Sequence, residues 1–141
     1  MAGTQRKVKR FVIDVSSYIT IFINRETDWL LHYIVQNKIE IFVDNLLIAE
    51  LTRVLNYPKI KNILPLDAIY YISFVRIIST HIVAKSFQIQ SPDPEDNYLY
   101  DLSLSAHAKL LVTGDGALVS WVDSPVETIS LSMFKTLFRN F

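Results

Sequence analysis

The sequence predicts an α/β fold in which helices cover both faces of a mainly parallel sheet. Short β-branched, apolar stretches alternate along the chain with segments of helical periodicity, and strands that are joined through helices pair in parallel. Of the 141 residues, 50% are apolar, which supplies one packed core. Only 3 glycines are present, so flexible spacers are not expected. We therefore expect one domain over residues 1–141, with residues 1–7 as a flexible N-terminal edge.

The first predicted strand ends directly at an acid. Residues 8–13 are mostly apolar, and Asp14 with two nearby serines can begin a helix. Apolar residues then recur at helical spacing over residues 17–36, with an interruption at residues 24–27. We expect one helix or two short helices in this segment.

The second predicted strand, residues 39–43, also ends at an acid. It consists largely of β-branched and aromatic residues, which favour strands. Asp44 or Asn45 can cap a helix that begins at Leu46, and Pro58 is expected to stop that helix.

The second half of the chain is predicted to alternate in the same way, because short β-branched runs again separate helical patterns. The predicted strands of this half are residues 82–84, 110–113 and 126–129. The predicted helices are residues 66–79, 95–109 and 132–138, with a proline-containing turn at residues 91–96 and a Gly-Asp-Gly turn at residues 114–116.

Four acids lie at the ends of predicted elements or at the margin of a packed face. Asp14 and Asp115 follow strands, and open parallel sheets present functional groups at the carboxyl ends of their strands. Asp96 opens a helix on the face that the rest of the molecule covers. Glu50 borders the apolar stripe of its helix, where Arg53 can pair with it at i,i+3.

Each acid also has a simple structural explanation. Asp14 can cap the following helix, and Asp115-Gly116 is an ordinary turn pair. Asp93 can be an N-cap with Pro94 at the first helical position and Asp96 at the third. The combination of four such acids, in a fold that brings strand ends together, favours one shared site over four separate caps.

Convergent carboxylates need relief from their repulsion. Two like charges ~4 Å apart repel by about 4 kcal/mol at an effective dielectric of 20. Either several acids stay protonated or a divalent cation binds them, and oxygen ligands without cysteine suit Mg²⁺ or Mn²⁺. Such a cation activates water for attack on a phosphodiester, so the acids predict a metal-dependent phosphoryl-transfer site.

Composition excludes several other classes of function. The 14 Lys and Arg balance the 14 Asp and Glu, so binding of nucleic acid through net charge alone is not expected. The absence of cysteine excludes thiol catalysis and predicts a cytoplasmic protein, and no apolar run approaches the ~20 residues that span a membrane. A basic cluster near the start of the chain either follows a phosphate backbone or is a solvated edge. It comprises Arg6, Lys7, Lys9 and Arg10.

Five sequence blocks resemble a known family when they are taken together. They are VIDVS at residues 12–16, AELTRVL at residues 49–55, YPK at residues 57–59, PDPEDN at residues 92–97 and LVTGD at residues 111–115. In order and spacing these blocks resemble PIN-domain proteins, specifically the VapC-like ribonucleases that are the toxins of bacterial toxin-antitoxin systems. The resemblance extends over nearly the whole chain.

The resemblance implies a three-layer α/β/α PIN-like domain and a ribonuclease that depends on Mg²⁺ or Mn²⁺. It implies that Asp93 is a supplementary ligand and that the Thr113 hydroxyl orients Asp115. Ser16 stands where the family has Asn or a small hydroxyl residue, and Asn97 replaces an acid found in some relatives. The metal-ligating and catalytic acids that the resemblance implies are Asp14, Glu50, Asp96 and Asp115.

Two functions from different classes follow. The first is a metal-dependent endoribonuclease that acts as a toxin, is neutralised by a cognate antitoxin protein, and forms a homodimer, as small toxins of this kind commonly do. The second, suggested by Ser16 and by the zero net charge, is a catalytically silent PIN-like module that binds a protein or RNA partner. A phosphoacceptor receiver domain is disfavoured because the first strand lacks the acid pair such domains place around the position of Asp14.

Overall fold

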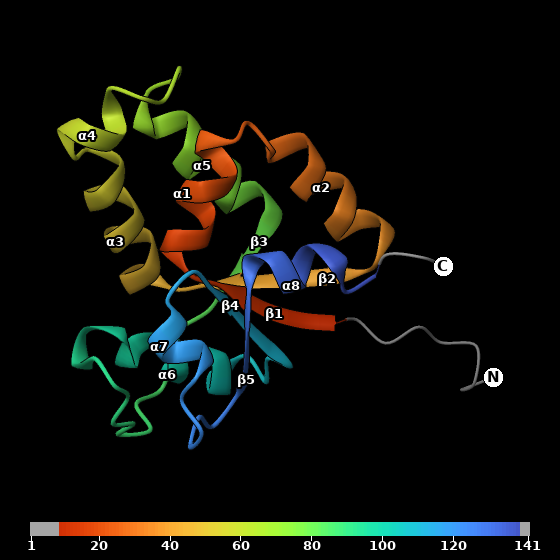
Figure 1. Ribbon diagram of the computed structural model, residues 1–141, viewed down its shortest axis with the longest axis vertical. Helices are drawn as coiled ribbons and strands as arrows, with labels where there is room; N and C mark the ends of the chain where they lie inside the picture. Colours follow the sequence, from red (N-terminus) through yellow and green to blue (C-terminus); the bar gives the residue numbers. More distant parts are fainter. Residues whose placement is uncertain (1–8, 139–141) are drawn as a thin grey trace.

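Five parallel strands form one sheet in the computed structural model, which describes residues 9–138 (Figure 1). The strand order is β3-β2-β1-β4-β5, and all four neighbouring pairs are parallel. The predicted α/β class with a parallel sheet is therefore confirmed. The edge expected at residues 1–7 lies outside the described residues. The strands are β1 (Lys9–Ile13), β2 (Ile39–Val43), β3 (Ser79–His81), β4 (Leu110–Thr113) and β5 (Glu127–Ser130).

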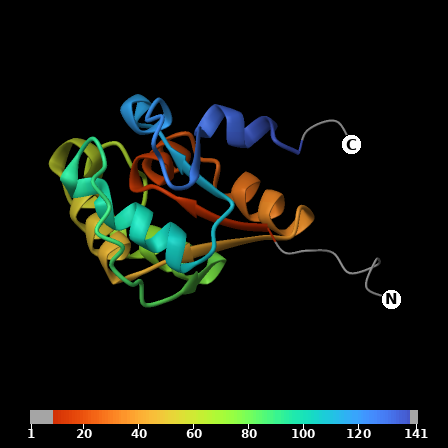
Figure 2. The same cartoon turned by 90° about the horizontal axis from the view of Figure 1, so that it is seen from below.

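Helices cover both faces of this sheet. In Figure 1, α1, α2 and α5 lie on one side of the strands and α6 lies on the other, and the view from below shows α6 (teal) against the sheet (Figure 2). Within residues 9–138, no helix is both long and apolar enough to cross a bilayer. The helices are α1 (Val15–Ile23), α2 (Thr27–Gln36), α3 (Asn45–Leu55), α4 (Pro58–Lys61), α5 (Ala68–Ile78), the 3₁₀ turn η2 (Pro94–Asp96), α6 (Asn97–Ser105), α7 (Gly116–Val119) and α8 (Leu131–Thr136).

The two central strands are buried because helices pack on both of their faces. Phe11, Val12 and Ile13 of β1 are at most 1% exposed, and all four residues of β4 are buried. Such strands are continuously apolar instead of alternating, which is why the sequence pattern identified them directly. The core therefore fixes the ends of β1 and β4 side by side.

The interruption expected at residues 24–27 is a turn between two helices. The chain leaves α1 through Arg25, which has a φ of 57°, and enters α2 at Thr27. In α3, Asp44 is the N-cap and its side chain accepts a hydrogen bond from the Leu47 amide at 2.8 Å. Of the alternatives that the sequence left open, the structure therefore has two short helices and an Asp44 cap.

Several local predictions need correction. The helix predicted over residues 95–109 is a 3₁₀ turn followed by α6, which ends at Ser105, and the last strand is Glu127–Ser130 instead of residues 126–129. The third strand is Ser79–His81, not residues 82–84, because residues 79–81 pair with β2 while Val83 projects into solvent at 89% exposure. The helix after β2 ends at Leu55, and Pro58 begins the short helix α4, where a missing N–H is tolerated. The helix α7 was not predicted from the sequence, because four residues are too few for a periodic pattern.

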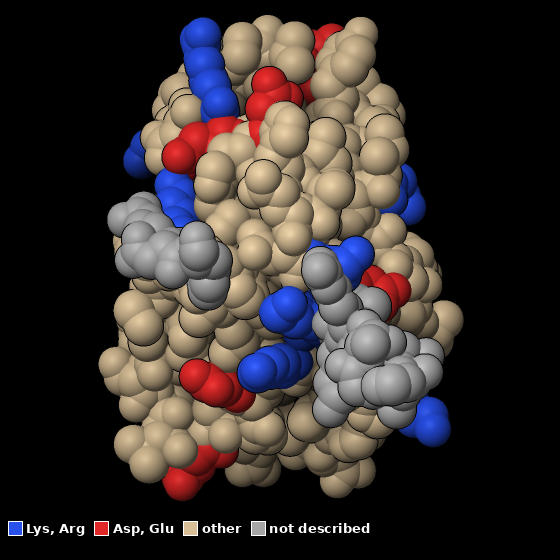
Figure 3. All heavy atoms as spheres, turned by 90° about the vertical axis from the view of Figure 1, so that its right-hand side faces the viewer, with Lys and Arg blue, Asp and Glu red and all other residues tan. Residues whose placement is uncertain are grey.

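Two residues of the basic cluster, Lys9 and Arg10, are described by the structure, and they form the amino end of strand β1. Lys9 Nζ donates to the Asn37 carbonyl at 3.0 Å, and Arg10 Nη1 donates to the Ala106 carbonyl at 3.2 Å. The backbone amide of Lys109, directly before β4, donates to the Arg10 carbonyl at the amino ends of β1 and β4. Figure 3 shows Lys and Arg side chains on this face of the molecule. Arg6 and Lys7 lie outside the described residues.

Candidate functional site

A cavity of about 880 Å³ lies at the carboxyl ends of β1 and β4, and it is lined by six carboxylates. The four acids predicted from the sequence all line it. Glu95, which the sequence did not single out, lines it as well, since it follows Pro94 in η2 and no periodicity distinguishes it there. The carboxylates are Asp14, Glu50, Asp93, Glu95, Asp96 and Asp115.

Asp14 lies at the bottom of this cavity and is 8% exposed. Its amide donates to the Val112 carbonyl at 2.8 Å, which ties the end of β1 to β4. Its Oδ2 accepts hydrogen bonds from the Thr113 hydroxyl at 2.7 Å and from the Ser16 hydroxyl at 3.2 Å. Burial raises the pKa of Asp14 above its ordinary value, and these two hydroxyl groups lower it by less than burial raises it.

The same two hydroxyl groups also bind the backbone beyond β4. The Thr113 oxygen accepts from the Asp115 amide at 3.1 Å, and the Ser16 oxygen accepts from the Gly114 amide at 3.1 Å. The resemblance implied that Thr113 orients Asp115, but the Thr113 hydroxyl proton points to Asp14, and its contact with Asp115 is to the backbone. Both hydroxyl groups therefore fix Asp14 relative to the turn that carries Asp115.

Asp115 and Asp93 each cap a short helical turn. Asp115 Oδ1 accepts from the Ala117 amide at 2.9 Å at the start of α7, and Asp93 Oδ1 accepts from the Glu95 amide at 3.0 Å at the start of η2. The predicted N-cap role of Asp93 with Pro94 at the next position is confirmed. A cap of this kind uses one carboxylate oxygen, and the second oxygen keeps its capacity to accept.

Asp96 ends η2 and begins α6, where its side chain is partly buried. Its pKa is raised to about 6, first by burial and then by the charges of Asp14, Asp93, Asp115 and Glu95. Carboxylates that raise one another's pKa face the same space. Asp96 shares the cavity with Asp14, Glu50 and Asp115, the other three acids that the sequence singled out.

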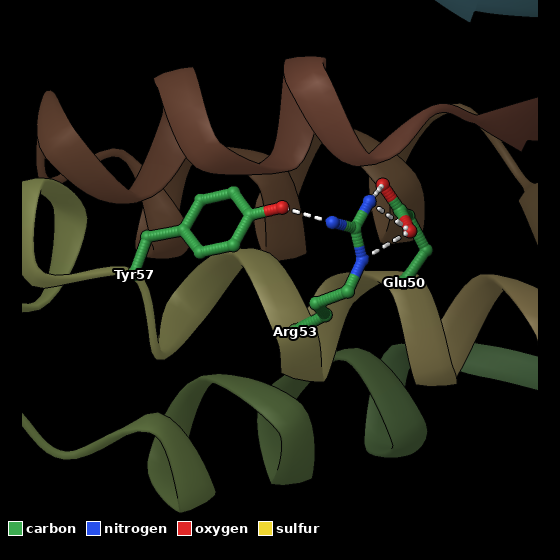
Figure 4. Close-up of polar contacts among 3 residues, drawn as sticks. All are labelled: Glu50, Arg53 and Tyr57. Carbon is green, nitrogen blue, oxygen red and sulfur yellow. Dashed lines mark hydrogen bonds and ion pairs between the residues drawn. The ribbon is translucent and has the colours of Figure 1, made fainter.

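Glu50 is bound to Arg53 one helical turn along α3 (Figure 4). Arg53 Nη2 donates to both oxygens of Glu50 at 2.7 and 2.6 Å, and Arg53 Nε donates to Oε1 at 3.0 Å. The remaining nitrogen, Nη1, donates to the Tyr57 hydroxyl. The predicted i,i+3 pair is confirmed, and it holds the Glu50 carboxylate at the rim of the cavity.

Tyr98 separates the main cavity from a second one of about 290 Å³ and lines both. Burial and the charges of Asp14, Glu50 and Asp96 raise the pKa of its phenol, so it stays protonated. From the sequence, Tyr98 was one aromatic residue among several in helical patterns. Its position between two cavities depends on how α6 packs beside α3, which no local pattern encodes.

The donor set of the cavity suits a hard divalent cation. Carboxylate oxygens are the ligands that Mg²⁺ and Mn²⁺ prefer. A cation would relieve the repulsion that, after burial, contributes to the raised pKa of Asp96. Within residues 9–138, however, no three acidic, histidine or cysteine side chains are gathered closely enough to hold a metal ion as they stand. One reason is visible: Glu50 is turned to Arg53, so cation binding requires this carboxylate to change partner.

In a comparison with protein-family models, residues 10–117 match the model described as PIN domain. The match includes all six carboxylates of the cavity. A search of curated proteins finds no match to the chain.

Proposed function

The chain belongs to the PIN-domain family, whose members are generally nucleases, and on this premise we propose that it is a metal-dependent endoribonuclease. The observation that supports this proposal is the convergence of six carboxylates from four separate parts of the chain on one cavity. Acids that served only as helix caps or surface charges would not need to share one space at a cost in repulsion. The reaction is hydrolysis of an RNA phosphodiester.

We assign the metal to four of these carboxylates. When bound, Mg²⁺ or Mn²⁺ supplies a water molecule of lowered pKa and positive charge beside the phosphate. Thr113 and Ser16 hold the Asp14 carboxylate in one orientation through their hydroxyl groups. We assign Asp93, which lines the same cavity, as a supplementary ligand. The four ligands are Asp14, Glu50, Asp96 and Asp115.

Cleavage of a fluorescent single-stranded RNA with Mg²⁺ or Mn²⁺ tests the proposal. We expect cleavage by the wild type, none in EDTA, and loss of cleavage in Asp14→Asn. Asp67→Asn is the matched control, because Asp67 is exposed, makes no side-chain cap hydrogen bond and lies outside the cavity. Equal cleavage by wild type and Asp14→Asn, or cleavage in EDTA, contradicts the assignment.

The biological role that we propose is that of a toxin in a toxin-antitoxin pair, which acts in the cytoplasm as a homodimer and is inhibited by a cognate antitoxin protein. Its support is the resemblance of the sequence blocks to VapC-like toxins. Expression of the chain alone should arrest bacterial growth, and co-expression of the small protein encoded next to its gene should restore growth. Normal growth on expression of active protein contradicts this role.

A catalytically silent module is the second candidate. The ion pair between Glu50 and Arg53 favours it, because Glu50 is a proposed metal ligand and its carboxylate is already bound to Arg53. Calorimetric titration with Mn²⁺ separates the two candidates. Binding by the wild type that is lost in Asp96→Asn supports the enzyme. A wild type that binds no Mn²⁺ supports the silent module.

A further inference from the structure

Arg53 is the one cation among the described residues that line the cavity, where it faces six carboxylates. An RNA backbone carries a negative charge at every phosphate, so it is repelled by such a lining unless positive charge is placed beside it. Lys9 and Arg10 lie at the amino end of β1, whereas the cavity lies at its carboxyl end. Arg53 is therefore the protein group best placed to contact a phosphate at this site.

The guanidinium of Arg53 is held in a way that allows exchange. Its side chain is 56% exposed and that of Glu50 is 34% exposed. Ion pairs in contact with solvent contribute little to stability, so changing the partner of Arg53 costs the fold little. The guanidinium lies 5.4 Å from the centre of the Tyr57 ring and donates to the Tyr57 hydroxyl (Figure 4). Tyr57 can thus keep Arg53 at the rim of the cavity when Glu50 turns away.

We propose, on the basis of the ribonuclease function above, that Arg53 is the group that binds the RNA phosphate and that Glu50 stores it until a divalent cation arrives. Glu50 cannot ligate a cation with both oxygens and keep its bidentate bond to Arg53. When Glu50 turns to the cation, the planar guanidinium is released with donors whose geometry matches a phosphate.

This exchange couples the two ligands. The cation and the RNA each compete with the same ion pair, so the binding of one removes a cost from the binding of the other. Mn²⁺ should therefore tighten RNA binding through Arg53, in addition to any direct contact with the phosphate. Removal of the Arg53 charge should leave Glu50 available and strengthen Mn²⁺ binding in the absence of RNA.

The test is the affinity of a nuclease-resistant 2′-O-methyl phosphorothioate oligonucleotide, measured by fluorescence anisotropy with and without Mn²⁺. In Mn²⁺ we expect Arg53→Gln to weaken binding about tenfold, the effect of losing charge-assisted hydrogen bonds. Without Mn²⁺ we expect Arg53→Gln and wild type to bind alike, because Glu50 then occupies the guanidinium. Arg53→Lys keeps the positive charge but loses the two parallel donors of the guanidinium, so in Mn²⁺ its affinity for the oligonucleotide should lie between those of wild type and Arg53→Gln.

Arg76→Gln is the matched control, since Arg76 is exposed on α5 and does not line the cavity. Equal oligonucleotide affinity of Arg53→Gln and Arg76→Gln in Mn²⁺ overturns the role of Arg53 while the ribonuclease proposal stands. Calorimetry with Mn²⁺ alone gives a second readout, in which Arg53→Gln should bind more tightly than wild type; weaker binding overturns the storage role of Glu50. A wild type that binds no Mn²⁺ overturns both proposals together.

Discussion

Replacement of Asp96 by Asn should stabilise the folded protein at neutral pH. Burial and the neighbouring carboxylates raise the pKa of Asp96 from an ordinary value of 3.8 to about 6. Between these two pH values the folded state binds more protons than the unfolded state, so the free energy of unfolding falls as pH rises and stays low above pH 6. The Asn side chain carries no charge, so it is not repelled by the neighbouring carboxylates. Within residues 9–138 the Asp96 side chain makes no hydrogen bond that the substitution would remove.

The size of the effect follows from the pKa. The interval from 3.8 to about 6 corresponds to at most about 3 kcal/mol at 1.36 kcal/mol per pH unit. Because the Asp96 side chain is partly open to solvent, screening reduces this figure, and we expect about 1 to 1.5 kcal/mol at pH 8. Near pH 4 the difference between Asp96→Asn and wild type should disappear, since Asp96 is then protonated in the folded state.

Urea unfolding in EDTA at pH 4, 6 and 8 measures this difference. Asp67→Asn serves again as the control and should track the wild type, because Asp67 is exposed and lies outside the cavity. If Asp96→Asn is no more stable than wild type at pH 8, the carboxylates do not repel one another in the folded protein, and the argument for a shared cation site fails.

Three further outcomes are expected. Mn²⁺ should raise the melting temperature of the wild type and leave that of Asp96→Asn unchanged; equal shifts in a thermal scan would place the ion elsewhere. Thr113→Val removes a hydroxyl group that binds both the Asp14 carboxylate and the Asp115 amide. Calorimetry should therefore show that the affinity for Mn²⁺ is lowered by about 10- to 100-fold. An unchanged affinity would exclude a role of Thr113 in orienting Asp14. Tyr18→Phe should raise the free energy of unfolding, measured with urea, by about 1 kcal/mol. The reason is that the Tyr18 hydroxyl is fully buried and has no hydrogen-bond partner among the described residues. A loss of stability would indicate that the hydroxyl has a partner such as buried water.

The sequence predicted the sheet best where burial dictates composition. Inner strands of a parallel sheet are covered on both faces, so β2 and β4 are mostly apolar, apart from Glu40 and Thr113, and their ends were found at the correct residues. The edge strand β3 carries no such pattern. Its residues are Ser79, Thr80 and His81, which are partly or fully exposed, and only their pairing with β2 makes them a strand.

The candidate site divides in the same way. The local sequence shows that acids follow strands and begin helices. A parallel sheet places the carboxyl ends of its strands at one edge, which is why Asp14 and Asp115 could be assigned to one site in advance. The strand order, which makes β1 and β4 neighbours, was decided by the tertiary structure. Glu50 and its pair with Arg53 were likewise accessible, since i,i+3 neighbours share a helix face.

Contacts between distant segments were decided by the tertiary structure alone. Thr113 donates to Asp14 across 99 positions of the chain, and Tyr98 lies between two cavities because α6 packs beside α3. A pattern that repeats every two or 3.6 residues indicates the face of its element on which a side chain lies, but not which distant residue that side chain meets after packing. The chemistry available at the site was set by residue types, and the partner of each carboxylate was set by the fold.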